Sequence, residues 1–145
     1  MTDRDRVALS GIVFAVLFAQ VLLYPGIPDL VEGLGGTPAV WGGDVGDILD
    51  AGKWFLTAEF LGFILFAGVW GAVSDAVGRR TPLVASGAAL GGIGYLALVA
   101  VPALGAPYAA VFPLRFLQGG ATIGAFSLAI TTLMDLPGGH GQNMG

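Results

Sequence analysis

The sequence is short of the residues on which soluble enzymes depend. It has no cysteine, a single histidine and only 11% charged residues among 145. The absence of cysteine excludes disulfides and thiol chemistry. Soluble domains typically carry about a quarter charged residues, so this chain has too few charges to cover a water-facing surface. No nucleophile–base set or cluster of metal ligands is visible, and the sequence predicts neither an enzyme nor a bound cofactor or metal.

Basic charge is also scarce. Six lysines and arginines stand against ten acidic residues, which gives a formal net charge of −4. The basic surface that nucleic-acid binding requires is therefore missing, and no nucleic-acid partner is expected. Apolar residues make up 55% of the chain, and the mean hydropathy is +0.82. This composition is typical of a protein whose solvent is lipid, and we expect an all-α, polytopic membrane protein.

Four apolar stretches are each long enough to cross ~30 Å of hydrocarbon at a helical rise of ~1.5 Å per residue. Proline, glycine or charged residues separate them, at Pro25–Pro28, at the charged turn after Ser74 and at Pro102–Pro107. We predict spans at 7–26, 54–74, 82–101 and 108–134, with an acidic outer loop at 27–53, a cytoplasmic loop at 75–81 and a cytoplasmic tail at 135–145.

The arginines predict the orientation, because cytoplasmic loops are enriched in basic residues. With the N-terminus in the cytoplasm, only Lys53 lies outside, and both ends of the chain lie inside a cell membrane. Trp54 and Tyr108 then fall at the outer interface, where aromatic residues gather. The opposite orientation would export four arginines, which are Arg4, Arg6, Arg79 and Arg80.

Small residues recur every four positions in three spans, a spacing that lets helices approach closely in lipid. The first span has Gly11, Ala15 and Ala19 at this spacing. The predicted packing positions of the later spans are Gly87 and Gly91 in the third and Gly119, Gly120 and Gly124 in the fourth. We therefore expect a compact bundle.

The turn between the second and third spans carries the most specific motif of the chain. It reads GAVSDAVGRRTPL from Gly71 to Leu83. Gly71 is expected to permit close helix approach, Asp75 to end a helix, and Gly78 to support a tight turn. An ordinary positive-inside loop would explain the arginines but not the joint placement of these residues.

This loop resembles the signature of the major facilitator superfamily, which Gly71, Asp75, Gly78, Arg79, Arg80 and Leu83 match. Val73 and Ala76 depart from its usual leucine and basic residue. The resemblance implies a gating cluster on the cytoplasmic side. In it, Arg79 would bridge Asp75 and the acid at the end of the fourth span, Asp135.

Two further segments resemble the same family. Arg115-Phe-Leu-Gln118-Gly119-Gly120-Ala121 is similar to a fourth-span motif of proton-coupled members, and Pro25–Pro28 is similar to the end of the first helix in twelve-span drug exporters. Family members have twelve or more spans in two six-helix halves. The resemblance therefore implies a partial N-terminal bundle, whose partners would include the remaining spans.

Two charges lie inside apolar spans, where each costs a few kcal/mol. Glu59 is sixteen residues above Asp75, and Arg115 is twenty above Asp135. The offset of four residues is short enough for long side chains to close, so the two could meet. If so, Arg115 would favour the charged carboxylate and the apolar surroundings the protonated form. Either charge could instead reach toward the outer interface. We predict a proton-coupling site or substrate cavity formed by Glu59, Arg115, Gln20 and Gln118.

The expected function is part of a proton-coupled secondary transporter that exports a small molecule by alternating access. Its partners would be membrane lipid, protons and an unidentified substrate. One alternative is a self-contained four-span exporter that dimerises, although such exporters use a glutamate in the first span and this chain has none there. Another is a non-transporting membrane subunit, which would need neither buried charges nor the loop motif.

Overall fold

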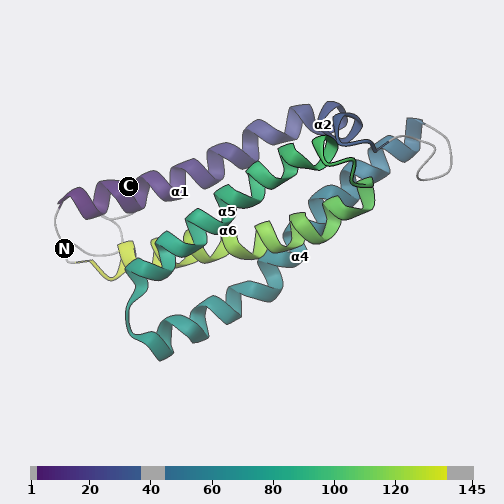
Figure 1. Ribbon diagram of the computed structural model, residues 1–145. Coiled ribbons are helices and arrows are strands. Elements are labelled where there is room, and N and C mark those ends of the chain that lie inside the picture. The colour runs from purple at the N-terminus through teal and green to yellow at the C-terminus, as the bar shows by residue number, and fades with distance from the viewer. Residues whose placement is uncertain (1–2, 37–44, 137–145) are drawn as a thin grey trace.

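The computed structural model describes residues 3–36 and 45–136, and most of these residues lie in four long helices (Figure 1). No strand occurs in these two ranges. The elements are the helices α1 (Asp3–Leu23), α2 (Ile27–Gly33), α4 (Val45–Val77), α5 (Arg80–Ala103) and α6 (Val111–Met134), with the 3-10 turns η1 (Tyr24–Gly26) and η2 (Tyr108–Ala110).

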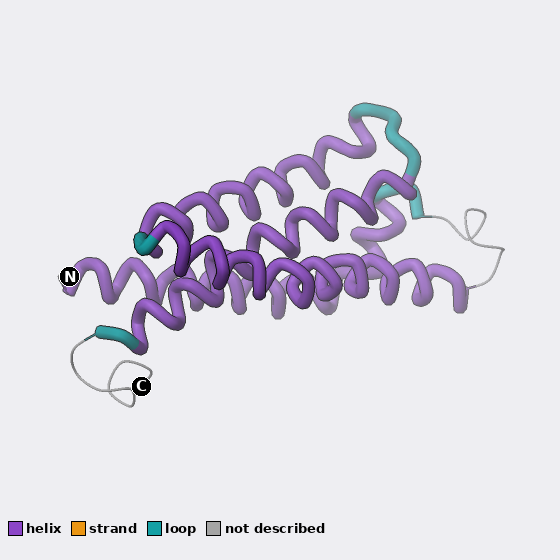
Figure 2. The backbone as a smooth tube through the Cα atoms, turned by 90° about the horizontal axis from the view of Figure 1, so that it is seen from below, coloured by secondary structure: helices purple, strands orange, loops and turns teal. Residues whose placement is uncertain are grey.

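Successive long helices run in opposite directions. The start of α1, the turn from α4 to α5 and the end of α6 share one end of the bundle, which we call the arginine end because Arg4, Arg6, Arg79 and Arg80 lie there (Figure 1). The segment after α1 and the α5–α6 connection share the opposite end, the loop end. The described connections lie only at these two ends (Figure 2). In this arrangement α4 and α6 run in the same direction.

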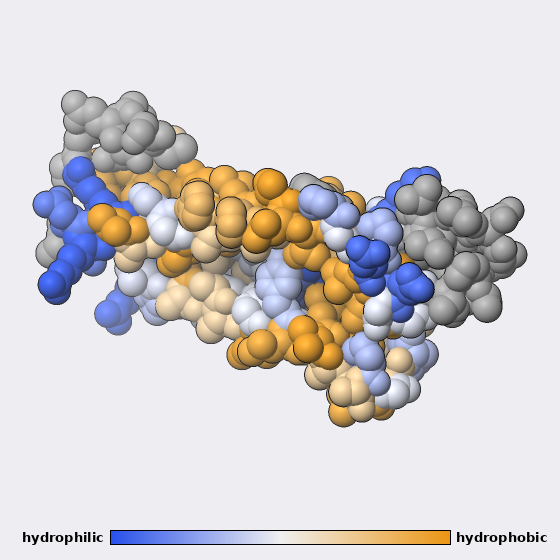
Figure 3. All heavy atoms as spheres, turned by 90° about the horizontal axis from the view of Figure 1, so that it is seen from above, coloured by the Kyte–Doolittle hydropathy of each residue, from blue (hydrophilic) through white to orange (hydrophobic). Residues whose placement is uncertain are grey.

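The outer faces of the helices are apolar. Each of four segments is long and apolar enough to span a membrane: Asp3–Leu23, Gly52–Val77, Arg80–Ala103 and Tyr108–Met134. Large side chains such as Phe14, Ile64 and Leu96 are mostly exposed on them. Polar surface gathers toward the two ends, with an apolar band between (Figure 3). Soluble proteins rarely expose so large an apolar surface to water. The all-α, polytopic membrane fold is therefore confirmed.

Helix α6 is the central element. Half of the residues in its most apolar 18-residue stretch are buried within the chain, against 11% in the corresponding stretches of α1 and α4. The reason is that α6 packs against α4, α5 and α1 in turn. Two clusters of apolar side chains form the core. One at the loop end includes Val31, Phe55 and Val111, and one at the arginine end includes Leu9 and Leu128.

Glycines set the distance between the helices. A Cβ added to Gly119 would lie closer than 3.0 Å to the backbone of Glu59, and one added to Gly87 would lie 2.6 Å from the backbone nitrogen of Ala125. The other three predicted packing glycines, Gly91, Gly120 and Gly124, face the side chains of Thr122, Phe66 and Trp70 at similarly short range. All five predicted packing glycines are therefore in close contact with a neighbouring helix.

The prediction for Gly71 is wrong within this chain. No described atom lies within 4 Å of a Cβ added at Gly71, and the same holds for Gly11. One tight backbone contact that was not predicted is at Gly62, where an added Cβ would collide with the backbone of Phe116. Small-residue spacing thus identified helices that pack closely, but not always the face that does so.

The outer loop also differs from its prediction. Helix α2 occupies part of it, and α4 begins at Val45 instead of near 54. Pro28 lies in the first turn of α2, where a missing backbone N–H costs nothing, so the Pro25–Pro28 segment ends one helix and begins the next. Tyr108, expected at the outer interface, lies at the loop end and is buried in the loop-end cluster. The predictions for residues 37–44 and for the tail at 137–145 lie outside the described residues.

Candidate functional site

The two charges predicted inside the spans meet within the bundle, in the half nearer its loop end. Gly119 brings the α6 backbone against that of Glu59 on α4. Arg115 lies one helical turn before Gly119, and its Nη2 donates to Glu59 Oε2 in an ion pair. Both side chains are fully buried. The protein thus holds one cation and one anion where neither reaches solvent.

A third span reaches the same carboxylate. Gln20 on α1 donates from Nε2 to Glu59 Oε1 over 2.7 Å. Each carboxylate oxygen therefore has its own donor, one cationic and one neutral. The two donors come from two different helices, α1 and α6.

Arg115 is held by side chains of its own helix and by aromatic rings. Its Nη1 donates to Gln118 Oε1, and Gln118 Nε2 donates to the Thr122 hydroxyl over 3.3 Å. The guanidinium carbon lies 4.3 Å from the centre of the Phe55 ring and 5.8 Å from that of Tyr95. A ring face attracts a desolvated cation by about 2 kcal/mol or more, which compensates part of the cost of burial.

Three members of this site were not predicted from the sequence. Phe55 precedes Glu59 by four residues and Thr122 follows Gln118 by four, so each lies on the same helix face as its predicted neighbour. That spacing was a usable signal. Tyr95 comes from α5, and no pattern in the sequence brings it to Arg115. The Tyr95 hydroxyl and Arg115 Nε are buried without a hydrogen-bond partner among the described residues.

The arginine end differs from the predicted cluster. Arg80, not Arg79, forms an ion pair with Asp135, and within the described residues neither Arg79 nor Asp75 takes part in one. Arg79 is the extended N-cap of α5, with φ −136° and ψ 105°, whereas Arg80 is its first helical residue. That one-residue step turns the two side chains apart. Because the pair is exposed, it is worth only ~0–1 kcal/mol.

The turn itself has the predicted geometry. Gly78 has a φ of +65°, which is the left-handed region that favours glycine. Its N–H donates to the carbonyl of Ser74 over 2.9 Å and closes the end of α4. Within the described residues, no three potential metal ligands gather in one place.

The comparisons with known proteins agree with this arrangement. Residues 9–143 match the model of the Major Facilitator Superfamily. No curated protein and no solved structure matches the chain. The matched range contains the membrane-spanning helices almost in full, the Gly71–Leu83 turn and the Glu59–Arg115 pair. The chain therefore belongs to the Major Facilitator Superfamily, a family of membrane transporters.

Proposed function

We propose that the chain is part of a proton-coupled secondary transporter that exports a small molecule. The observation that carries this proposal is the fully buried Glu59–Arg115 pair between α4 and α6, whose carboxylate also accepts a hydrogen bond from Gln20 on α1. Charges inside membrane spans are costly and generally mark ion or substrate pathways. A proton is the smallest ligand that could change this site, because it converts Glu59 into a neutral acid.

Each side chain has a distinct role in the proposal. Glu59 takes up and releases the proton, and Arg115 favours its charged form. Phe55 keeps the cation stabilised while Glu59 is neutral, because the ring attraction does not depend on the carboxylate. Gln20 and Gln118 hold the two charged groups in position and line the path of the substrate. The Arg80–Asp135 pair would open and close the cytoplasmic side.

The test is transport driven by a proton gradient. Alternating access needs two repeats that move against each other, and we propose that further spans complete this bundle. In proteoliposomes containing the pH dye pyranine, the 145-residue chain alone is expected to show no compound-driven proton flux. In a transporter completed by those spans, Arg115→Ala should abolish gradient-driven flux while membrane insertion persists, and Glu59→Gln should change its pH dependence.

Thr57→Ala is the matched control, since Thr57 is an exposed polar residue two positions from Glu59 on the same helix. It should leave flux unchanged. An unaltered pH profile in Glu59→Gln would remove Glu59 from the mechanism. Robust accumulation by the 145-residue chain alone would favour the dimeric four-span exporter instead.

We also propose that the arginine end faces the cytoplasm of a cell membrane. The chain has no cysteine, so single cysteines can report the orientation without background. Leu104→Cys, in the exposed α5–α6 turn, should react with a membrane-impermeant maleimide in intact cells. Ala76→Cys, at the arginine end, should react only after permeabilisation. The reverse pattern would show the opposite orientation.

A further inference from the structure

A series of hydrogen bonds runs along α6 from Thr122 to the buried ion pair. Gln118 Nε2 donates to the Thr122 hydroxyl over 3.3 Å, and Arg115 Nη1 donates to Gln118 Oε1. The three residues lie on one face of the helix, and all three are buried. A buried polar group that loses its partner carries the full cost of its desolvation, so each member of the series depends on its neighbour.

The Thr122 hydroxyl fixes the direction of these hydrogen bonds. A hydroxyl has one hydrogen, and Thr122 donates it to the backbone carbonyl of Gln118 over 2.8 Å. The hydroxyl oxygen then acts as the acceptor for the NH₂ group of Gln118. The amide oxygen is thereby turned toward Arg115, whose guanidinium has donors alone. The reversed amide would set donor against donor at both of its ends.

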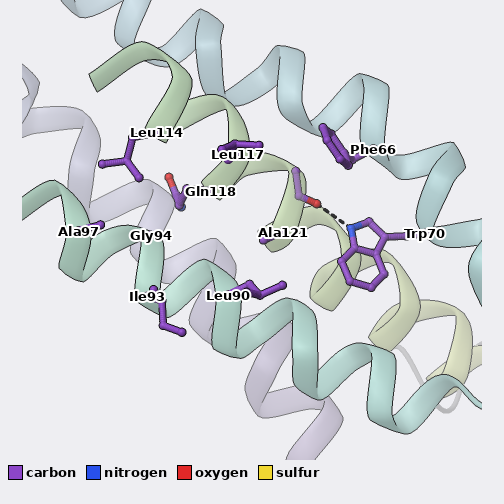
Figure 4. A pocket seen from close by; sticks show the side chains of 11 residues that line it. Phe66, Trp70, Leu90, Ile93, Gly94, Ala97, Leu114, Leu117, Gln118 and Ala121 are labelled. Atoms are coloured by element: carbon purple, nitrogen blue, oxygen red, sulfur yellow. Dashed lines mark hydrogen bonds between the residues drawn. The ribbon is translucent and has the colours of Figure 1, made fainter. Parts of the chain in front are cut away.

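Helix α5 restricts both side chains from behind. A Cβ added to Gly94 would lie 2.5 Å from Gln118 Cγ (Figure 4). One added to Gly91 would lie 2.8 Å from the Thr122 hydroxyl oxygen. Glycine at these two positions leaves room for the two side chains, whereas at Gly92 no described atom lies within 4 Å of an added Cβ. Helix α5 therefore holds the residues that hold Arg115.

We propose that Thr122 is a positioning residue for Arg115 and acts through Gln118. Thr122 orients the amide, the amide oxygen holds Arg115 Nη1, and Nη2 is thereby directed at Glu59. The consequence for transport rests on the proposed function. When Glu59 becomes a neutral acid, the oriented amide keeps the guanidinium in place, so that the ion pair forms again at the same position.

Thr122→Val tests the proposal, because valine keeps the shape of the side chain and removes the hydroxyl. The probe is the full chain in nanodiscs, labelled with ¹⁵N-glutamine. The sequence has three glutamines, Gln20, Gln118 and Gln142, so the side-chain amide signals are few. Deuterium exchange of the Gln118 amide should become about tenfold faster in Thr122→Val, which corresponds to the loss of one typical hydrogen bond.

A second label reads the position of Arg115 itself. Arg115 is the one buried arginine in the described ranges, so its guanidinium signals differ from those of arginines near the membrane surface. In ¹⁵N-arginine-labelled chain, rotation of the Nη1 group should be slow, because Gln118 holds it. Thr122→Val should speed this rotation by a similar factor. Thr122→Ser, which restores the hydroxyl, should return both signals to their original behaviour.

Thr132→Val is the matched control. Thr132 is also buried on α6 and donates to the carbonyl of Leu128 over 2.6 Å, but no side-chain amide in the described part of the chain donates to it. Its loss should leave Gln118 and Arg115 unchanged. Unchanged signals in Thr122→Val, or equal changes in Thr122→Val and Thr122→Ser, would overturn the proposal, because Thr122 would then act through packing alone.

Gly94→Ala gives an independent route if Thr122→Val does not fold. The added methyl group would displace Gln118 and should speed the rotation of Arg115 Nη1, whereas Gly92→Ala should not. Equal rotation rates in these two variants would contradict the hold of Gln118 on Arg115. None of these measurements uses transport, so they can fail while the flux experiments on the completed transporter succeed, and the reverse.

Discussion

Arg115→Leu is expected to destabilise the bundle by about 3–5 kcal/mol, the cost of removing one partner from a buried ion pair. The variant leaves the Glu59 carboxylate without its cation and removes the contact of the guanidinium with Phe55. Domains are typically stable by only ~5–15 kcal/mol, so the loss is large. Sodium dodecyl sulfate titration in mixed micelles, followed by circular dichroism, measures it.

Two further variants show whether the lost stability comes from breaking the Glu59–Arg115 ion pair. Arg79→Leu removes an exposed arginine and should change stability by less than ~0.5 kcal/mol. The double variant Glu59→Leu/Arg115→Leu should recover much of the loss, because an apolar replacement of a buried pair is often neutral or stabilising. Additive losses in the double variant would contradict a direct pairing.

Gly119→Ala is expected to lower stability by at least ~1–3 kcal/mol, the usual cost of overpacking. The added methyl group would collide with the backbone of Glu59, which cannot rotate away as a side chain could. Gly62→Ala should act alike, because its methyl group would collide with the backbone of Phe116. Both changes separate α4 from α6, so their combined effect should be smaller than the sum.

Gly68→Ala gives a control of opposite sign. Gly68 is on α4, and no described atom lies within 4 Å of an added Cβ. Alanine is the better helix former by up to ~1 kcal/mol, so this variant should be neutral or stabilising. Equal losses at Gly68 and Gly119 would show that helix flexibility, not close packing, makes these glycines necessary. Titration in mixed micelles compares the three variants directly.

Local chemistry made the spans predictable. Clusters of proline and glycine and charged turns interrupt apolar runs locally, so the Pro102–Pro107 segment and the Asp75–Arg80 turn were informative without knowledge of the fold. Tertiary contacts override such signals in the 27–53 stretch, where glycine and acidic residues concealed α2 and the start of α4. The choice of Arg80 over Arg79 was also hidden, because it depends on where α5 begins its first turn.

The depth of the ion pair along α4 and α6 could be calculated from the sequence, but the contact between the two side chains could not. Counting sixteen residues back from Asp135 on α6, as from Asp75 to Glu59 on α4, gives residue 119. The structure places Gly119 against the Glu59 backbone. That count becomes a contact only because α4 and α6 are neighbours, and Gln20 joins only because α1 lies against them. Neighbour relations among helices arise from packing over the whole bundle, which no single span encodes.

Close glycine contacts join three of the long helices, α4, α5 and α6, but not α1. Gly119 and Gly87 bring α6 into backbone contact with α4 and α5, so sliding any of these three helices would drive side chains into backbone. Helix α1 has no such contact at Gly11 and packs on α6 through side chains. Contacts at these glycines therefore hold α4, α5 and α6 together more tightly than α1 is held. Because Gln20 lies on α1, a tilt of that helix would withdraw one hydrogen-bond donor from Glu59, so a displacement at the edge of the bundle would reach the buried ion pair directly.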